Sequence, residues 1–242
     1  MKVALVGQDM VGQGVQYVTA MTARMFVKWG WEVDIVLSQV HLDLLKEGKK
    51  PFEVPPQVRF HYLASRRSSR NILSLRKYLK QEKPDIVIAE SGLYSWCLRW
   101  ASFGIPKSKL PKMAQVVHGN GGLWDITRTW QNRLKYTVKH TFLYSKYDVL
   151  MTVNEEMVKT YKFTTRYLKN FKIYCVNNAC CDEVYQKKVK LPPTHPWLVN
   201  KECPTFVTAG SYTPGKCHMM LLRAFNKVEN QRRARLIIYG IV

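Results

Sequence analysis

Long apolar runs, paired cysteines and acidic residues are all scarce in this sequence of 242 residues. No stretch approaches the roughly 18 apolar residues that a membrane span needs, so we expect any membrane contact to be peripheral, on the inner face. The six cysteines form no CxxC pair and have no histidine at metal-ligand spacing, so the sequence predicts no metal site. Such thiols are typical of a reducing compartment, and MKVALVG is not a signal-peptide pattern, so we expect a cytoplasmic protein.

The shortage of acids leaves a strong positive charge. Lys and Arg total 38 against 17 for Asp and Glu, which gives a formal net charge of +21. This field favours anionic partners: nucleic acid, acidic lipid head groups or phosphorylated small molecules. The cations gather with apolar and aromatic residues in three segments without acids, 59–80, 128–146 and 159–172, as in basic segments that lie on an interface. A solvated basic face is the alternative. Since no nucleic-acid reader motif accompanies the charge, we expect an anionic membrane surface as a partner and no nucleic acid.

Short apolar runs indicate the strands of a buried parallel sheet. They occupy residues 2–6, 31–37, 58–63, 86–89, 114–117, 148–153 and 172–176. Helical patterns follow at 15–29, where Gly30 provides the stop, at 72–80 and from about residue 155. Strands that alternate with helices predict the α/β class, with a right-handed, doubly wound parallel sheet. We assign residues 1–190 to this first domain.

A second, smaller region follows a linker at 191–203, which begins with the proline-rich LPPTHPW. From Thr205 to Gly240 the chain reads as a strand, a glycine-containing loop with one lysine, an amphipathic helix and a strand. This pattern is one β–α–β unit, and one such unit cannot cover both faces of a parallel sheet. Residues 204–242 therefore predict an incomplete second Rossmann-like domain.

Four segments carry a resemblance to a known family, in that family's order. They are VGQDMVGQGVQYVTAMTARMFVKWGWEVDIV, LRKYLKQEKPDIVIAES, VLMTVNEEMVKTY with KIYCVNNACCDEVYQ, and HPWLVNKECPTFVTAGSYTPGKCHMMLLRAFNKV. Each pattern is weak alone. Together they make the chain resemble the retaining glycosyltransferases of GT-B architecture called glycosyltransferase family four (group 1), over nearly its whole length.

The resemblance implies transfer of a sugar from a nucleotide-sugar co-substrate to a lipid-linked or polysaccharide acceptor, with retention and without a metal or other cofactor. Backbone amides at a helix start bind phosphate oxygens, and glycine lets them approach closely. The expected donor and phosphate-binding residues are Gly12, Gly14, Gly210 and Lys216. His118 matches a family position near the donor sugar and is the expected catalytic residue, while Asn120 and Gly121 are expected on the acceptor side. The structural alternatives are tight turns, a solvated lysine and a buried, satisfied histidine.

The chain also departs from the family. Ser211 stands where the family commonly has an arginine, and serine cannot provide a bidentate cation. Gly240 is followed by Ile241 where the family continues with Gly-Glu-Gly, and the family's later Glu-x7-Glu pair does not follow. We therefore expect a chain that is truncated within its C-terminal domain and has little or no activity. The resemblance to an enzyme family thus does not decide whether this chain is itself a catalyst.

Two other function classes are considered. The first alternative is a non-catalytic module that binds the acceptor or an anionic membrane, for which the first domain and the positive field suffice. A dinucleotide-dependent enzyme is disfavoured, because Gly12-Gln13-Gly14 is followed by Val15-Gln16-Tyr17 without the third glycine. In addition, no acid ends the second predicted strand, where Leu37-Ser38 stands.

Overall fold

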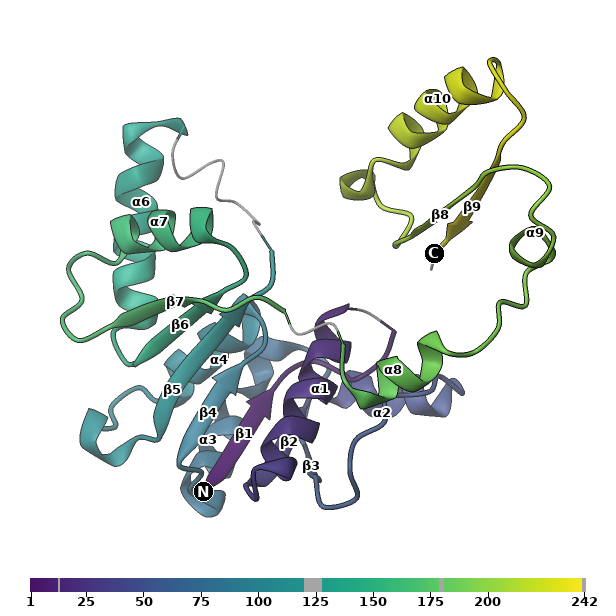
Figure 1. Ribbon diagram of the computed structural model, residues 1–242. Helices are drawn as coiled ribbons and strands as arrows, with labels where there is room; N and C mark the ends of the chain where they lie inside the picture. The colour runs from purple at the N-terminus through teal and green to yellow at the C-terminus, as the bar shows by residue number, and fades with distance from the viewer. Residues whose placement is uncertain (13, 120–127, 179–180, 241–242) are drawn as a thin grey trace. The chain divides into compact units, whose positions relative to one another are not determined.

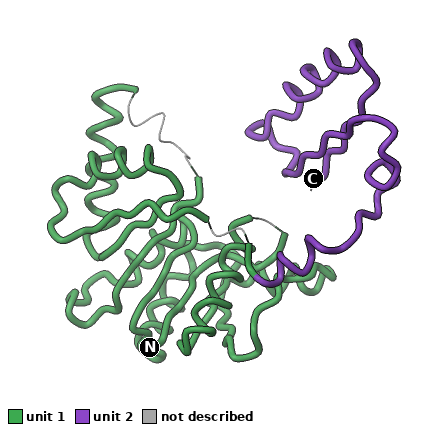
Figure 2. Tube along the Cα trace, viewed as in Figure 1, with its two compact units in different colours: residues 1–182 green, residues 183–242 purple. Residues whose placement is uncertain are grey.

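The computed structural model describes residues 1–12, 14–119, 128–178 and 181–240. The chain divides into two compact units, residues 1–182 and 183–242, shown in different colours in Figure 2. Within the described residues, no helix has both the length and the apolar character that crossing a membrane requires.

Unit 1 is built on a parallel sheet of seven strands (Figure 1). In chain order the strands are β1 (Lys2–Val6), β2 (Glu32–Leu37), β3 (Arg59–Tyr62), β4 (Ile86–Ala89), β5 (Lys112–Val117), β6 (Val149–Thr152) and β7 (Lys172–Cys175). Their order across the sheet is β3-β2-β1-β4-β5-β6-β7, and all six pairings are parallel. The α/β class and the doubly wound parallel sheet predicted from the sequence are confirmed.

Both faces of this sheet are buried, which explains why its strands are continuous apolar runs. On β1, Val3 and Leu5 belong to one core cluster, whereas Ala4 and Val6 belong to the other. The first cluster packs against α1, and the second packs against α3, α4, α6 and α7. Because side chains of a strand alternate between its faces, a shift of register by one residue would exchange these two sets.

Helices connect the strands and have identifiable ends. They are α1 (Gly14–Lys28), α2 (Gln39–Lys46), α3 (Ile72–Glu82), α4 (Gly92–Ala101), α6 (Trp130–Tyr144) and α7 (Glu155–Thr164), with short 3-10 turns η1 (Ser68–Asn71) and η2 (Lys107–Lys109). Side chains of Ser38, Ser91, Thr129 and Asn154 accept hydrogen bonds from backbone amides at the starts of α2, α4, α6 and α7. Gly30 ends α1 with a φ of 76°, as the sequence predicted.

Unit 2 has a single two-stranded sheet. Its elements are α8 (Glu183–Val189), α9 (Pro196–Val199), β8 (Thr205–Ala209), η3 (Pro214–Lys216), α10 (His218–Glu229) and β9 (Arg235–Tyr239). Strands β8 and β9 are parallel and pair from Thr205 with Arg235 to Ala209 with Tyr239. Among the described residues of this unit, Ala234 and Ile237 are the buried apolar ones, and no residue of α10 is buried. Phe206 of β8 contacts Phe225 of α10, with ring centroids 6.0 Å apart, whereas Val207 points to the other face and is 52% exposed.

Candidate functional site

A cavity of about 630 Å³ lies in unit 1 at the carboxyl ends of β1, β4 and β5. Its lining includes Gly7 after β1, Glu90 after β4 and His118 after β5. Strands β1 and β4 are neighbours although β2 and β3 follow β1 in the chain, so the connections from β1 and from β4 lead in opposite directions along the sheet. Ligands of open α/β sheets bind at such a switch point, and the volume is in the range of small-molecule sites.

Glu90 and His118 face each other in this cavity. The Oε2 atom of Glu90 lies 3.2 Å from the Nε2 atom of His118, and their side chains are 5% and 9% exposed. A carboxylate only accepts hydrogen bonds, so the neutral imidazole carries its proton on Nε2 and keeps a lone pair on Nδ1. Glu90 thereby sets which nitrogen of His118 acts as an acceptor.

Asp9 orients a second polar side chain in the same way. Its Oδ1 atom accepts from the backbone amide of Val11 at 2.9 Å and from Nε2 of Gln16 at 3.2 Å. The amide nitrogen of Gln16 must therefore point to Asp9, which leaves the Oε1 atom as the free acceptor on the other side of the group. Gln16 stands in the first turn of α1 and lines the cavity.

Neither Nδ1 of His118 nor Oε1 of Gln16 has a hydrogen-bond partner among the residues that the structure describes. Both atoms are buried, and a buried acceptor without a partner costs about 1–3 kcal/mol. Because protein atoms cover them, a ligand reaches them only after a local adjustment of side chain or loop. Two acceptors held by carboxylates suit a ligand that offers hydroxyl groups, and they do not suit an anion.

One wall of the cavity is an aromatic layer. The hydroxyl of Tyr144 donates to Oε1 of Gln115 at 3.0 Å, and Nδ1 of His140 lies 2.8 Å from Oγ1 of Thr164. The ring of His140 stacks on that of Tyr161, with centroids 5.1 Å apart. Burial, together with the nearby charge of Lys139, lowers the pKa of His140 to about 4. The imidazole of His140 is therefore uncharged at physiological pH.

Buried contacts hold Met10 in its place between β1 and α1. Met10 is fully buried, and its backbone amide donates to Nδ1 of His41 at 3.3 Å. Burial lowers the pKa of His41, which keeps this nitrogen unprotonated and able to accept. Gly12 has a φ of 78°, a conformation that glycine adopts without strain. Gly14, the first residue of α1, has open space where a Cβ would lie.

The predicted phosphate residues of unit 2 contact each other. A Cβ at Gly210 would lie 3.5 Å from Cδ of Lys216, so the lysine stem runs along this glycine. Lys216 ends the turn η3, and Nε2 of His218 lies 3.0 Å from the backbone oxygen of Ser211. The loop thus has one exposed cation beside a glycine, and Ser211 adds no charge to it.

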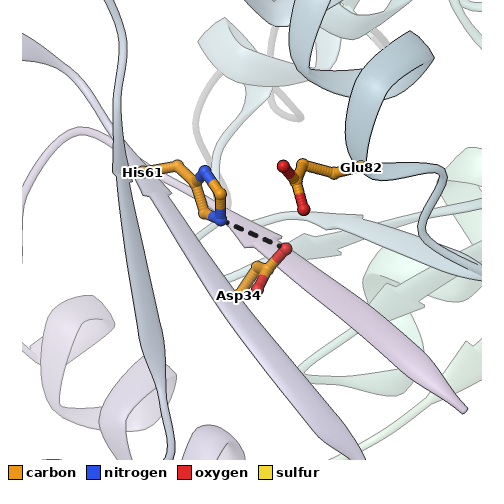
Figure 3. Close-up of side chains that lie close together, drawn as sticks. All are labelled: Asp34, His61 and Glu82. Atoms are coloured by element: carbon orange, nitrogen blue, oxygen red, sulfur yellow. Dashed lines mark ion pairs between the residues drawn. The ribbon is translucent and has the colours of Figure 1, made fainter.

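A second polar cluster lies away from the cavity lining, around the buried carboxylate of Asp34. Figure 3 shows Asp34 of β2, His61 of β3 and Glu82 of α3 converging; one potential metal-ligand atom from each lies within 4.8 Å of the others. Cations already stand among them: Nζ of Lys2 lies 2.7 Å from Glu82 and 3.4 Å from Asp34, and Nε of Arg59 lies 2.9 Å from Asp34.

Hydrogen bonds keep Asp34 ionised inside the fold. Burial alone would raise the pKa of Asp34, but hydrogen bonds from Tyr78 and Arg59, with the charges of His61 and Lys2, outweigh it and lower the pKa. The two carboxylates are balanced by Lys2 and Arg59, so we interpret the cluster as an ion-pair network that ties β1, β2, β3 and α3 together, and not as a metal centre.

Comparison with known proteins decides the family. Residues 12–179, most of the chain, match the model of Glycosyltransferase Family 4. The chain belongs to glycosyltransferase family 4. This confirms the family that the four sequence segments predicted. A search of curated proteins found no match for this family 4 chain.

Solved glycosyltransferases share the fold of this family 4 chain. HepE from Anabaena, solved with UDP and glucose, has a TM-score of 0.55 at 10% identity, covering 100% of this chain and 70% of its own. A glycosyltransferase from Rickettsia africae gives 0.56 at 16% identity, covering 99% of this chain and 60% of its own. The lipopolysaccharide outer core galactosyltransferase WaaB, in its apo form, gives 0.55 at 12% identity, covering 98% and 60%. The family 4 chain thus spans 60–70% of the length of these proteins, and the likeness shows a GT-B type fold.

The residues that the sequence proposed are divided between the two units of the family 4 chain. His118 lines the cavity, and Gly14 begins α1 directly before the cavity-lining Val15 and Gln16, while Gly12 stands before that helix. Gly210 and Lys216 lie together in unit 2. Asn120 and Gly121 lie outside the described residues.

Sequence reasoning missed Glu90, Asp9 and Gln16. A usable signal existed for Glu90, because it directly follows the apolar run 86–89, as His118 follows 112–117. The carboxyl ends of neighbouring parallel strands meet at one edge of the sheet, so a polar residue after each of two such runs predicts a pair. For Gln16 the sequence gives no comparable signal, since its role depends on the amide being turned by Asp9.

Proposed function

We propose that the protein transfers a sugar from a nucleotide-sugar donor to a lipid-linked or polysaccharide acceptor. The observation that carries the proposal is the cavity at the switch point of the sheet, with Glu90 and Asp9 orienting His118 and Gln16. Hydroxyl groups of a sugar are the ligands that such acceptors bind. Membership of glycosyltransferase family 4 and the shared fold with UDP-bound glycosyltransferases support the same reaction class.

In this proposal each unit has its own task. Unit 1 presents the acceptor, and Nδ1 of His118 accepts a hydrogen bond from a sugar hydroxyl. The amides around Gly12 and Gly14 at the start of α1 face phosphate oxygens, while Gly210 and Lys216 bind the diphosphate and offset the charge that develops on the leaving group. Retention of configuration and transfer without a metal follow the family resemblance.

The proposal includes the localisation of the protein and its level of activity. We place the protein in the cytoplasm with its basic segments against anionic lipid on the inner face of a membrane. Residues 1–242 alone are expected to transfer sugar weakly, because their second unit offers one β–α–β unit and one loop lysine for a diphosphate.

Saturation-transfer NMR with UDP-, GDP- and ADP-sugars tests the proposal, because it detects weak binding without turnover. We expect saturation of sugar protons by the wild-type chain and roughly tenfold weaker sugar binding by His118→Leu, which removes the acceptor but keeps apolar bulk. Glu90→Gln permits either tautomer of His118 and is expected to weaken sugar binding in the same direction. His61→Gln changes a histidine that does not line the cavity and serves as the control.

The same titration separates the two function classes. Donor-sugar binding that is equal in His118→Leu and wild type would exclude His118 from the binding of the donor sugar. No saturation by any sugar nucleotide, with a correctly folded chain, would favour the alternative of a non-catalytic module that binds an acceptor or a membrane.

A further inference from the structure

Helix α6 exposes an apolar stripe. Trp130, Leu134, Val138 and Phe142 recur every fourth residue and therefore lie on one side of the helix. Trp130 is 72% exposed and Val138 is 62% exposed. The opposite side of the helix is the one that packs on the core, through Thr137, His140, Leu143 and Tyr144. The stripe is thus in addition to the buried side and has no role in the core of unit 1.

Helix α4 extends this stripe into a wider surface. The ring of Phe142 lies 6.0 Å from that of Trp96 and 5.4 Å from that of Trp100, and Trp100 lies 5.9 Å from Phe103. We call the whole the α4–α6 surface. It consists of Leu93, Trp96, Trp100, Phe103, Trp130, Leu134, Val138 and Phe142. Monomeric proteins rarely expose a continuous apolar surface of this kind unless it binds a partner.

The charge around the surface indicates which partner. Between Ser91 and Tyr147 the sequence has nine Lys and Arg residues and a single acid, Asp125, which lies outside the described residues. Lys135 and Lys139 are exposed, directly follow Leu134 and Val138, and stand one turn apart, so they border the stripe. A second copy of this chain would bring the same positive charge to the contact, which opposes self-association.

An anionic bilayer offers what both parts of this surface require. Its acyl region takes up Leu, Val and Phe side chains, its head groups attract Lys, and Trp favours the boundary between the two. We propose that the α4–α6 surface seats unit 1 on a membrane that contains anionic lipid. Of the three basic segments, this assigns 128–146, which contains α6, to the membrane contact.

The surface also borders the cavity. Leu93 and Trp96 of α4 belong to both, and Tyr136 and Lys139 of α6 line the cavity beside the stripe. A protein seated in this way holds its cavity at the level of the lipid head groups. Of the two acceptor classes in the proposed function, this favours the lipid-linked one, and the inference rests on that function in this point only.

Sedimentation with lipid vesicles tests membrane binding by the α4–α6 surface without any enzymatic step. We expect the chain to bind vesicles of phosphatidylcholine that contain phosphatidylglycerol, to bind vesicles of phosphatidylcholine alone far less, and to lose binding as salt increases. Leu134→Asp is expected to weaken binding roughly tenfold or more, since it removes a buried apolar side chain from the contact. Lys135→Glu should weaken it at least about fivefold, the value of one cation near an anionic surface.

Leu191→Asp is the matched control, because it makes the same change at a leucine that is 68% exposed and lies outside both the α4–α6 surface and the three basic segments. Vesicle binding that is equal in Leu134→Asp and in wild type would overturn the proposal. So would a dimer in size-exclusion chromatography that Leu134→Asp dissociates while vesicles are not bound. We expect Leu134→Asp to leave sugar-nucleotide binding without vesicles unchanged. If the wild-type chain bound no sugar nucleotide, that result would count against the proposed function and not against the membrane contact.

Discussion

His140 lies in the aromatic wall of the cavity, where burial opposes protonation of its imidazole. Its pKa is about 4 in the folded chain because of burial, against an ordinary value of 6.5. As the pH falls from 6.5 to 4, His140 is protonated in the unfolded chain but stays neutral in the folded chain. The free energy of unfolding therefore decreases over this pH range. A shift of this size corresponds to roughly 3 kcal/mol, and the contribution is complete above pH 6.5.

Replacing His140 by phenylalanine should flatten this part of the stability curve. The hydroxyl of Thr164 keeps its hydrogen bonds to the backbone oxygens of Thr160 and Tyr161, so the substitution leaves no buried donor unpaired. We expect the free energy of unfolding in urea to fall between pH 7 and pH 4.5 by a few kcal/mol less in His140→Phe than in wild type. An identical fall in both proteins would show that His140 titrates normally.

At the scale of single elements, Asp34 holds the amino end of the sheet together. Asp34→Asn keeps the shape of the side chain but leaves Lys2 and Arg59 without their counter-charge. We expect a loss of about 2–3 kcal/mol in unfolding free energy, below the full cost of breaking a buried pair because the side chain of Arg59 is 51% exposed. Chemical denaturation at pH 7 measures this loss.

Asp43→Asn provides the control for Asp34, because Asp43 also pairs with an arginine. Its partner Arg66 has a side chain that is 72% exposed, and a surface ion pair contributes about 0–1 kcal/mol. Equal losses in the two variants would contradict the view that burial of Asp34 is what makes its ion pairs important. The pKa of Asp34 is lowered in the fold, so its contribution is present above the ordinary carboxyl pKa and is lost as the pH falls below it.

The elements also show which parts of the fold a single sequence reveals. Strands such as β1 and β4 were predicted at their observed bounds, because a parallel strand buried on both faces is a continuous apolar run. Helices α4 and α6 were missed, since both carry apolar residues on their core side and on the α4–α6 surface. The second apolar side makes the one-sided pattern of α6 weaker than that of α1, which was predicted. The exposed apolar residues that obscure the pattern of α6 are also those from which the membrane contact is inferred.

The candidate site was predictable only in part, for a related reason. His118 was found because the family motif points to it, whereas Glu90 becomes its partner only when β4 and β5 are placed side by side. A single sequence does not give strand order directly, although the rule for switch points brings these two positions to one edge. Gly210 and Lys216 lie close together because they are six residues apart in one loop, and their phosphate-binding role stays a prediction.

At the scale of the whole molecule, the two units differ in how they are stabilised. Both core clusters lie within unit 1, which covers its sheet on both faces. Its last residue, Asp182, forms an ion pair with Arg24 of α1, so the unit closes on itself at that point. Unit 2 buries little apolar surface within its described residues, and burial is the main source of folding free energy.

Residues 1–182 expressed alone are therefore expected to fold. We expect calorimetry to give a cooperative melting transition within a few degrees of the main transition of the whole chain, whereas residues 183–242 alone should show no cooperative transition. Aggregation or gradual melting of residues 1–182 would contradict this. Because the cavity lining lies within unit 1, the fragment should also keep the sensitivity of sugar binding to Glu90→Gln. That result would place hydroxyl recognition in unit 1 and leave the diphosphate as the part of the donor that depends on Lys216.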